Sequence, residues 1–263
     1  PCYMRGISDI NGYSDGNLRS HRLPGPCGAR TCINDKNTAP HDVAMRKYDL
    51  VCFDMDGVLT DIRSSWCWIH RCLDVDNEES YRLFCEGAID EPEFIMRDVS
   101  LWKTVEPRIG HRDLIRHFRS IPLIGGIQET VACLKGNGMK CVIISGGIDI
   151  AARMIAAEFG FDDSQAVELV ADDEGVLTGE GIRHVKLSDK GGNVRHFIEK
   201  YGTTRERTVS IGNSFTDIPM FENSGMSIAF NPVDPCTEAA ATHVVRSDNI
   251  SDVLDHILEE TCP

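Results

Sequence analysis

The chain of 263 residues lacks three features, and each absence excludes a class of protein. It has no run of 18 apolar residues, so no transmembrane helix is expected. None of its 11 cysteines form a Cys-x-x-Cys pair, which favours free thiols in a reducing cytoplasm. Positive charge is scarce, and a net charge of −14 argues against a surface that binds nucleic-acid phosphates. We therefore expect a cytoplasmic protein without nucleic-acid or membrane partners.

The apolar content of 41% is high enough for a substantial core, but it is unevenly distributed. Residues 1–44 are rich in Gly, Asn, Arg, Ser and Pro and show almost no apolar periodicity, which predicts a disordered tail. Residues 62–120 are rich in charge and helix formers, with apolar residues at helical spacing. We interpret residues 45–61 and 121–263 as one core domain, and residues 62–120 as an inserted helical cap.

Strands and helices alternate through the predicted core, which indicates a parallel sheet with helices on both faces. A hairpin with a glycine turn is predicted over residues 167–183. The expected strands are 49–53, 140–144, 208–211, 227–230 and 243–245, and the expected helices are 126–135, 149–158, 191–200 and 250–259.

Two acids, Asp54 and Asp56, follow directly on the apolar strand 49–53. Carboxylates are costly beside a buried strand unless a metal or a reaction requires them. Alternation along the strand sends both side chains to the same side, and two adjacent like charges raise the pKa of one of them. The pair therefore suits a nucleophile next to a proton donor.

Polar residues also follow the second and third predicted strands. Ser145 and Gly146 end the second, and Asn213 and Asp217 follow the third. The carboxyl ends of parallel strands share one edge of a sheet, so these groups should meet Asp54 in one crevice.

The expected crevice combines oxygen ligands with groups that bind anions. Its carboxylates and amide suit Mg²⁺ better than zinc. The N–H groups after Ser145 are expected to open a helix and so form an anion site, and Lys190 adds a positive charge, with Lys186 as the alternative. A metal, a carboxylate nucleophile and these donors together predict phosphoryl transfer.

Four segments in this order resemble the four motifs of the haloacid dehalogenase (HAD) superfamily. They are residues 53–60 (FDMDGVLT), 142–147 (VIISGG), 190–191 (KG) and 212–217 (GNSFTD). Residues 86–103 are similar to the cap segment of the phosphoserine phosphatase-like branch. The resemblance covers about residues 48–258 and implies a Rossmann-like HAD core with a helical cap inserted after the first strand.

The resemblance implies a role for each motif residue. Asp54 would attack phosphorus and form an aspartyl-phosphate, while Asp56 would protonate the leaving oxygen and later deprotonate water. Mg²⁺ would be held by Asp54, the Asp56 carbonyl and Asn213, with Asp217 at or beside the metal. The phosphoryl oxygens would be held by Ser145, the Gly146 N–H and Lys190.

Some positions depart from the family pattern. Asn213 and Thr216 stand where the fourth motif usually has Asp and Asn. Arg63 and Asp98 occupy the positions at which phosphoserine phosphatases hold the substrate ammonium with Glu and its carboxylate with Arg. The inverted pair could hold a reversed zwitterion, Arg63 could bind another anion, or the two residues could pair with each other or with water.

The sequence therefore predicts a Mg²⁺-dependent phosphatase that acts on a small phosphorylated metabolite, with phosphoserine as one candidate. A phosphotransferase or phosphomutase of the same fold, and a weakened HAD domain that acts as a binding module, are the alternatives. Asp56 favours the phosphatase, because a non-catalytic site has no need for a second costly carboxylate. The sequence leaves the oligomeric state open.

Overall fold

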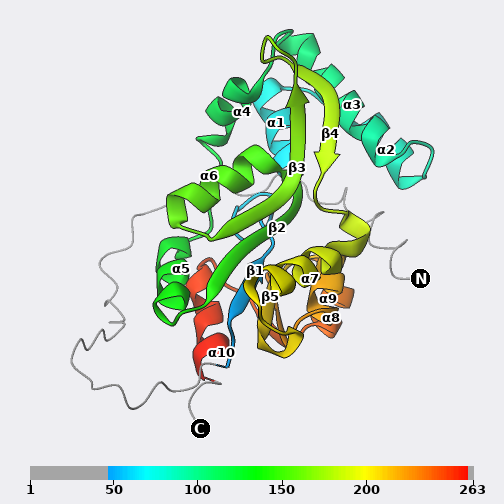
Figure 1. Cartoon of the computed structure of the whole chain (residues 1–263). Coiled ribbons are helices and arrows are strands. Elements are labelled where there is room, and N and C mark those ends of the chain that lie inside the picture. The colour runs from blue at the N-terminus through cyan, green and yellow to red at the C-terminus, as the bar shows by residue number, and fades with distance from the viewer. Residues whose placement is uncertain (1–46, 260–263) are drawn as a thin grey trace. The chain divides into compact units, whose positions relative to one another are not determined.

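Seven strands form one sheet in the order β4-β3-β2-β1-β5-β6-β7 in the computed structural model, which describes residues 47–259 (Figure 1). Within these residues, β4 runs antiparallel to β3 and the other pairings are parallel. The predicted tail, residues 1–44, lies outside the described residues. The strands are β1 (Leu50–Phe53), β2 (Lys140–Ile148), β3 (Asp163–Ala171), β4 (Leu177–Arg183), β5 (Thr208–Gly212), β6 (Met226–Phe230) and β7 (His243–Val245).

Helices cover both faces of this sheet, as the alternation of elements predicts. The core helices are α5 (Ile127–Gly136), α6 (Asp149–Phe159), α7 (Lys190–Tyr201), α8 (Ile218–Glu222), α9 (Pro235–Ala240) and α10 (Val253–Glu259). Short 3₁₀ turns are η2 (Leu187–Asp189), η3 (Arg205–Arg207), η4 (Phe215–Asp217) and η5 (Ile250–Asp252).

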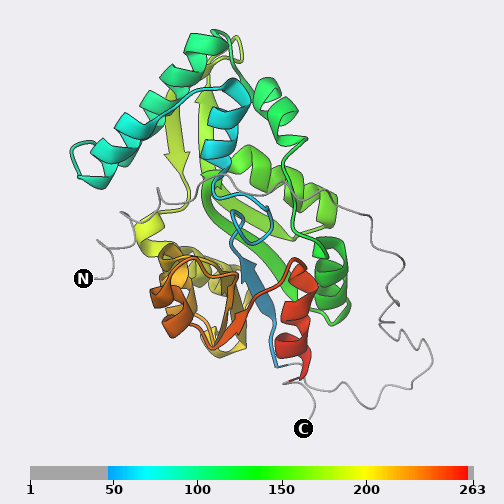
Figure 2. The same cartoon turned by 180° about the vertical axis from the view of Figure 1, so that it is seen from behind.

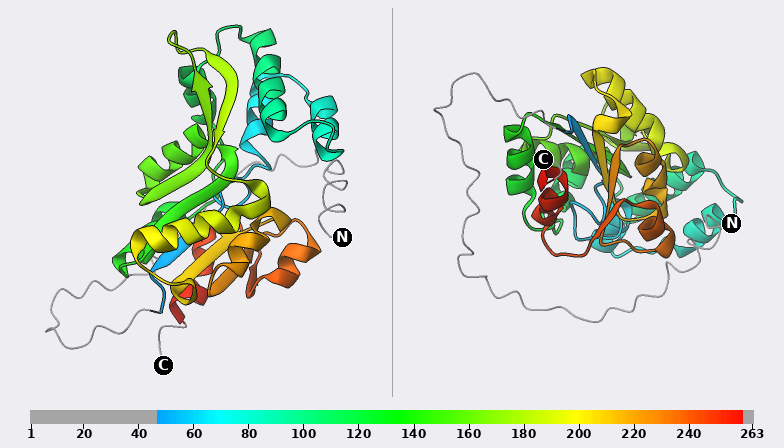
Figure 3. Two further views of the ribbon diagram at one scale, coloured as in Figure 1. Left: turned by 45° about the vertical axis from the view of Figure 1, so that its right-hand side comes forward. Right: turned by 90° about the horizontal axis from the view of Figure 1, so that it is seen from below.

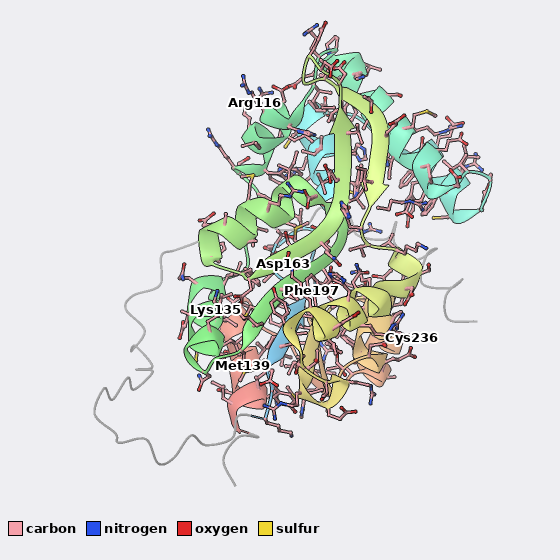
Figure 4. The ribbon with its side chains drawn as sticks, viewed as in Figure 1. Arg116, Lys135, Met139, Asp163, Phe197 and Cys236 are labelled. Carbon is pink, nitrogen blue, oxygen red and sulfur yellow. The ribbon has the colours of Figure 1, made fainter. Side chains whose placement is uncertain are left out.

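Alternate residues of β1 supply the two halves of the core. Val51 and Phe53 pack in the cluster that contains residues of α5, α6 and α10, while Leu50 and Cys52 pack against residues of α7 and α8. Figure 3 shows α5 and α10 on one side of the sheet and α7 and α8 on the other. Phe197 of α7 is fully buried in the second cluster, at the position labelled in Figure 4.

The central place of β1 decides where its end lies. All four residues of β1 are fully buried, and Phe53 pairs with Ile143 of β2 and with Ile211 of β5. The residue after β1 continues this pairing, because the Asp54 N–H donates to the Ile211 carbonyl at 2.9 Å. Asp54 is therefore flanked by the end of β5 on one side and, on the other, by β2, which continues past it to Ile148.

Between β1 and the rest of the core, the chain forms a helical cap, which in Figure 2 lies beyond the end of β1. Its helices are α1 (Ser65–Leu73), α2 (Glu78–Cys85), α3 (Glu91–Val105) and α4 (His111–Phe118). Ile69 and Trp102 are fully buried in the interior of this cap, whereas α2 has no fully buried residue. The hairpin of β3 and β4 packs beside α3, and Leu177 N–H donates to Ile109 carbonyl at 2.9 Å.

The structure agrees with most predicted elements and differs at the second strand. β2 continues to Ile148 instead of ending at residue 144, because Ile148 still pairs with Val167 of β3 after a shift of register. The expected turn glycine, Gly175, has φ +81°, and Gly160 ends α6 with φ +78°. The domain boundaries that we infer from composition stay predictions. None of the described helices is long and apolar enough to cross a bilayer.

Candidate active site

A buried lysine at the start of α7 lies between two buried aspartates that follow β1 and β5. Lys190, the first residue of α7, places its Nζ 2.9 Å from Asp54 Oδ1 and 2.7 Å from Asp217 Oδ1. The side chains of Lys190, Asp54 and Asp217 are only 2%, 6% and 0% exposed, respectively. The alternative lysine, Lys186, is exposed on the surface. Three segments that are distant in sequence thus meet at one point.

The electrostatics of this cluster favour bound positive charge. Burial and, to a smaller extent, the negative charge of Asp217 raise the pKa of Asp54 to about 7, although Lys190 opposes both effects. Burial also lowers the pKa of Lys190, but Asp217 and Asp54 outweigh that effect and keep the ammonium protonated. With the half-buried Asp56 nearby, three carboxylates surround one buried ammonium, so negative charge is in excess.

Asp217 also fixes the loop that follows β5. Its Oδ2 accepts hydrogen bonds from the backbone N–H groups of Asn213, at 2.9 Å, and Ser214, at 3.0 Å. A β-carbon at Gly212 would lie 2.4 Å from the Asp217 Cβ, so only glycine fits there. The carboxylate therefore holds both the loop and Lys190. Thr216 in the same loop bonds to Ser214 through their hydroxyl groups, 2.8 Å apart.

Asp56 lies on the tight turn that follows β1 and is held separately from Lys190. Its Oδ2 accepts hydrogen bonds from the Ser65 N–H, at 2.9 Å, and from Ser65 Oγ, at 3.0 Å. Burial raises the pKa of Asp56, and the hydrogen bonds from Ser65 partly oppose the rise. The two acids of the first motif thus have different surroundings, with Asp54 buried and Asp56 half-buried, as different roles would require.

The predicted anion site after Ser145 has a different form from the expected one. Ser145 is buried, and its Oγ accepts a hydrogen bond from the Gly147 N–H at 3.0 Å. These residues belong to β2, and α6 begins only at Asp149, whose carboxylate contacts Arg153 at 2.6 Å. The N–H groups after Ser145 therefore lie in a strand and not at a helix N-terminus, and their binding of an anion stays a prediction.

Arg63 and Asp98, the two candidate residues for substrate selection, do not pair with each other, although such a pair was one of the alternatives. Asp98, in α3, is 1% exposed and lies inside the cap. Its Oδ1 is 3.3 Å from His70 Nε2 and 3.1 Å from Asn77 Nδ2. Arg63 is exposed, before the start of α1. Asp98 therefore pairs with cap residues, which sequence spacing alone does not reveal.

The residues at the strand ends fit a magnesium ion by their donor chemistry. Within residues 47–259 no three Asp, Glu, His or Cys side chains are grouped to hold a metal. The predicted set instead has two carboxylates, from Asp54 and Asp217, with the Asn213 amide and a main-chain carbonyl. Asn213 packs against Gly57, where a β-carbon would lie 2.0 Å from Asn213 Nδ2. Oxygen donors beside excess negative charge suit a hard divalent cation.

Two contacts of the first turn of α1 were not predicted. Besides the bonds from Ser65 to Asp56, Trp66 Nε1 donates to the Gly146 carbonyl at 3.2 Å. The serines at 64 and 65 precede an apolar helix, a pattern that indicates a helix cap, and Ser64 Oγ does accept from the Trp66 N–H. Nothing in the sequence indicates that the second serine, Ser65, contacts Asp56.

Comparison with known proteins identifies the family. A sequence model of the haloacid dehalogenase-like hydrolases matches residues 51–222, which is more than half of the chain. The phosphoserine phosphatase of Methanocaldococcus jannaschii is 28% identical over 215 residues, which cover 81% of this chain and 99% of that protein. The phosphoserine phosphatase of Halobacterium salinarum is 32% identical over 141 residues, covering 52% and 66%.

Solved structures agree with this match. A phospho-aspartyl intermediate analogue of phosphoserine phosphatase superimposes with a TM-score of 0.67 and 27% identity, covering 80% of this chain and 99% of that one. A substrate-bound phosphoserine phosphatase gives the same TM-score and identity, covering 80% and 98%. The motif order, the fold and these relatives lead to one conclusion. The chain belongs to the haloacid dehalogenase-like hydrolases.

Proposed function

We propose that the chain is a Mg²⁺-dependent phosphatase that hydrolyses a small phosphorylated metabolite through an aspartyl-phosphate on Asp54. One observation carries the proposal: Asp54 is buried at the end of the central strand, with Lys190 joining it to Asp217. Relatives with similar sequence and fold are phosphoserine phosphatases, which supports the same class of reaction. A cytoplasmic location, which the many thiols favour, belongs to the same proposal.

The residues divide the reaction between them. The Asp54 carboxylate attacks phosphorus, and Lys190 offsets the negative charge of the phosphoryl oxygens. Asp56 gives a proton to the leaving oxygen and then accepts one from the water that hydrolyses the aspartyl-phosphate. Asp54, Asn213, Asp217 and the Asp56 carbonyl would hold Mg²⁺, which supplies further charge neutralisation. Ser145 and the Gly146 N–H are the proposed phosphoryl contacts on the other side of Asp54.

The cap is the proposed source of substrate selection, with Arg63 and Thr216 as candidate contacts. Asp98 is a weaker candidate, because it is buried inside the cap and its Oδ1 already contacts His70 and Asn77. L-phosphoserine is the first substrate to test, and a panel of phosphorylated metabolites should follow.

The test is turnover of p-nitrophenyl phosphate and of L-phosphoserine by the wild type, with Mg²⁺ and with a chelator. We expect activity that requires the metal and that Asp54→Asn abolishes, because an amide cannot form the phosphoenzyme. Asp61→Asn is the matched control, since Asp61 is an exposed acid of the same segment. Full activity of Asp54→Asn would contradict the proposal.

The same assay separates hydrolysis from phosphoryl transfer. A hydrolase releases equal amounts of phosphate and alcohol, even when acceptor alcohols are added. A phosphotransferase would release less phosphate than alcohol under those conditions. A binding module would show no turnover of any ester.

A further inference from the structure

The first residue of α1 connects the cap, the acid Asp56 and the end of β2. Ser65 is fully buried. Its N–H and its Oγ both bond to Asp56 Oδ2, at 2.9 and 3.0 Å, and its Oγ also lies 3.0 Å from the Ile148 nitrogen. No step of the proposed reaction has yet used this residue.

The hydrogen of the Ser65 hydroxyl has only one possible direction. The Ile148 N–H can only donate, so Ser65 Oγ accepts from it and must donate its own hydrogen to Asp56 Oδ2. Oδ2 thus receives two donors. The other oxygen, Asp56 Oδ1, has one weak contact, from Thr60 Oγ1 at 3.4 Å, and that hydroxyl also lies 3.2 Å from the Met55 carbonyl.

Close packing keeps this arrangement in place. A β-carbon at Gly147 would lie 2.3 Å from Ser65 Oγ and 2.7 Å from Asp56 Oδ2. The glycine therefore lets the strand approach both groups, and neither has room to rotate away on that side.

We infer that Ser65 is a positioning residue that orients the carboxyl group of Asp56 for proton transfer, an inference that rests on the proposed function. Because Oδ2 faces two donors, a proton on Asp56 is carried by Oδ1. As the bond from Asp54 to phosphorus forms, the bond from phosphorus to the leaving oxygen breaks. The leaving oxygen keeps that electron pair and takes the proton from Oδ1.

The second step reverses these roles. Water loses a proton to Asp56 Oδ1 while its oxygen bonds to phosphorus. The bond between phosphorus and Asp54 breaks, and its electron pair restores the Asp54 carboxylate. The orientation set by Ser65 serves both transfers, and it reaches Asp56 from the cap, because Ser65 begins the first cap helix.

The test compares two esters by kcat/KM, which reports formation of the phosphoenzyme. An alkyl phosphate has a poor leaving group that needs the proton from Asp56, whereas p-nitrophenyl phosphate needs it little. We expect Ser65→Ala to lower kcat/KM about 10²-fold for an alkyl phosphate that the wild type hydrolyses, and by a much smaller factor for the aryl ester. A purely structural role would lower both values equally.

Ser64→Ala is the matched control, because Ser64 caps the same helix through the Trp66 N–H and does not contact Asp56. It should lower both values by the same small factor. Ser65→Cys retains a weak hydrogen-bond donor. Its ratio of kcat/KM for the alkyl ester to kcat/KM for the aryl ester should lie between the ratios of wild type and Ser65→Ala. Ser65→Cys replaces Ser65→Ala if the alanine variant does not fold.

The outcomes separate this inference from the proposed function. If the wild type turns over both esters, Asp54→Asn is inactive, and the Ser65 variants keep the wild-type ratio, the positioning role is wrong and the phosphatase remains. If the wild type hydrolyses neither ester, the proposed function itself fails.

Discussion

The strand-end site and the cap both bury charged side chains, but they balance those charges differently. In the core, Lys190 lies between Asp54 and Asp217, with Asp56 close enough to add to the negative charge. In the cap, Asp98 contacts His70 and Asn77, and a protonated His70 balances the negative charge of Asp98. Excess charge in the core suits a bound cation and a reaction, whereas balanced charge in the cap suits a structural role. The position of an acid in a family motif therefore does not decide its role.

The largest effect should come from removing the lysine of the core site. Lys190→Met leaves Asp54 and Asp217 buried without their ammonium, so we expect kcat to fall about 10²–10³-fold. The free energy of unfolding should also fall, by about 3–5 kcal/mol, because breaking a buried ion pair leaves uncompensated charge. Steady-state kinetics and urea unfolding measure the two effects. Lys186→Met, at an exposed lysine nearby, is the control and should change neither.

The corresponding change in the cap should affect stability more than chemistry. Asp98→Asn keeps the shape of the side chain but removes the charge that faces His70. We expect the free energy of unfolding to fall by about 2–3 kcal/mol, measured with urea, and kcat for an aryl phosphate to change little. A stable Asp98→Asn variant that no longer binds its substrate would instead show that Asp98 reads the substrate.

The difference between the two regions also explains what the sequence could predict. The predicted fold and family are confirmed. They could be predicted because apolar strands, turn glycines and four ordered motifs are local features of the sequence. Asp54 and Asp217 meet because β1 and β5 are parallel neighbours, and the start of α7 brings Lys190 to them. The chemical roles of these residues stay predictions.

Contacts between distant side chains could not be predicted in the same way. The bond from the Ile148 N–H to Ser65 joins residues 83 positions apart, and that from Asn77 to Asp98 joins residues 21 apart. Neither pair has a spacing that indicates contact, since each depends on how the cap helices pack. The strand 140–144 was predicted too short because two glycines end the apolar run, although β-pairing continues to Ile148.

The pairing of His70 with Asp98 predicts how the stability of the cap depends on pH. Burial lowers the pKa of His70, but its contacts with Asp98 and Cys67 outweigh burial and raise the pKa from 6.5 to about 9. The folded state therefore holds this proton more tightly than the unfolded state. The stabilisation is complete below pH 6.5 and is lost as the pH rises through about 9.

Urea unfolding of wild type and His70→Gln at pH 6, 7.5 and 9 tests this sign. The advantage of the wild type should shrink by up to about 3 kcal/mol across that range. If the stability advantage of the wild type over His70→Gln grew with pH instead, the buried histidine would be neutral. Lys190 offers no such switch in this range, because its two carboxylates keep it protonated.

The smallest expected effect returns to the core and concerns the amide in its acidic cluster. Asn213 brings an oxygen but no charge, and its side chain lies against Gly57 beside the turn that carries Asp56. Asn213→Asp should therefore lower the Mg²⁺ concentration for half-maximal activity, by about ten-fold, because a carboxylate ligand adds negative charge to the site. A titration of activity with Mg²⁺ measures the shift, with Asn223→Asp as a control at an amide that bonds to Arg195 instead. If Asn213→Asp needed more magnesium than the wild type, the amide would not be a ligand, and Asp54, Asp217 and the Asp56 carbonyl would hold the ion without it.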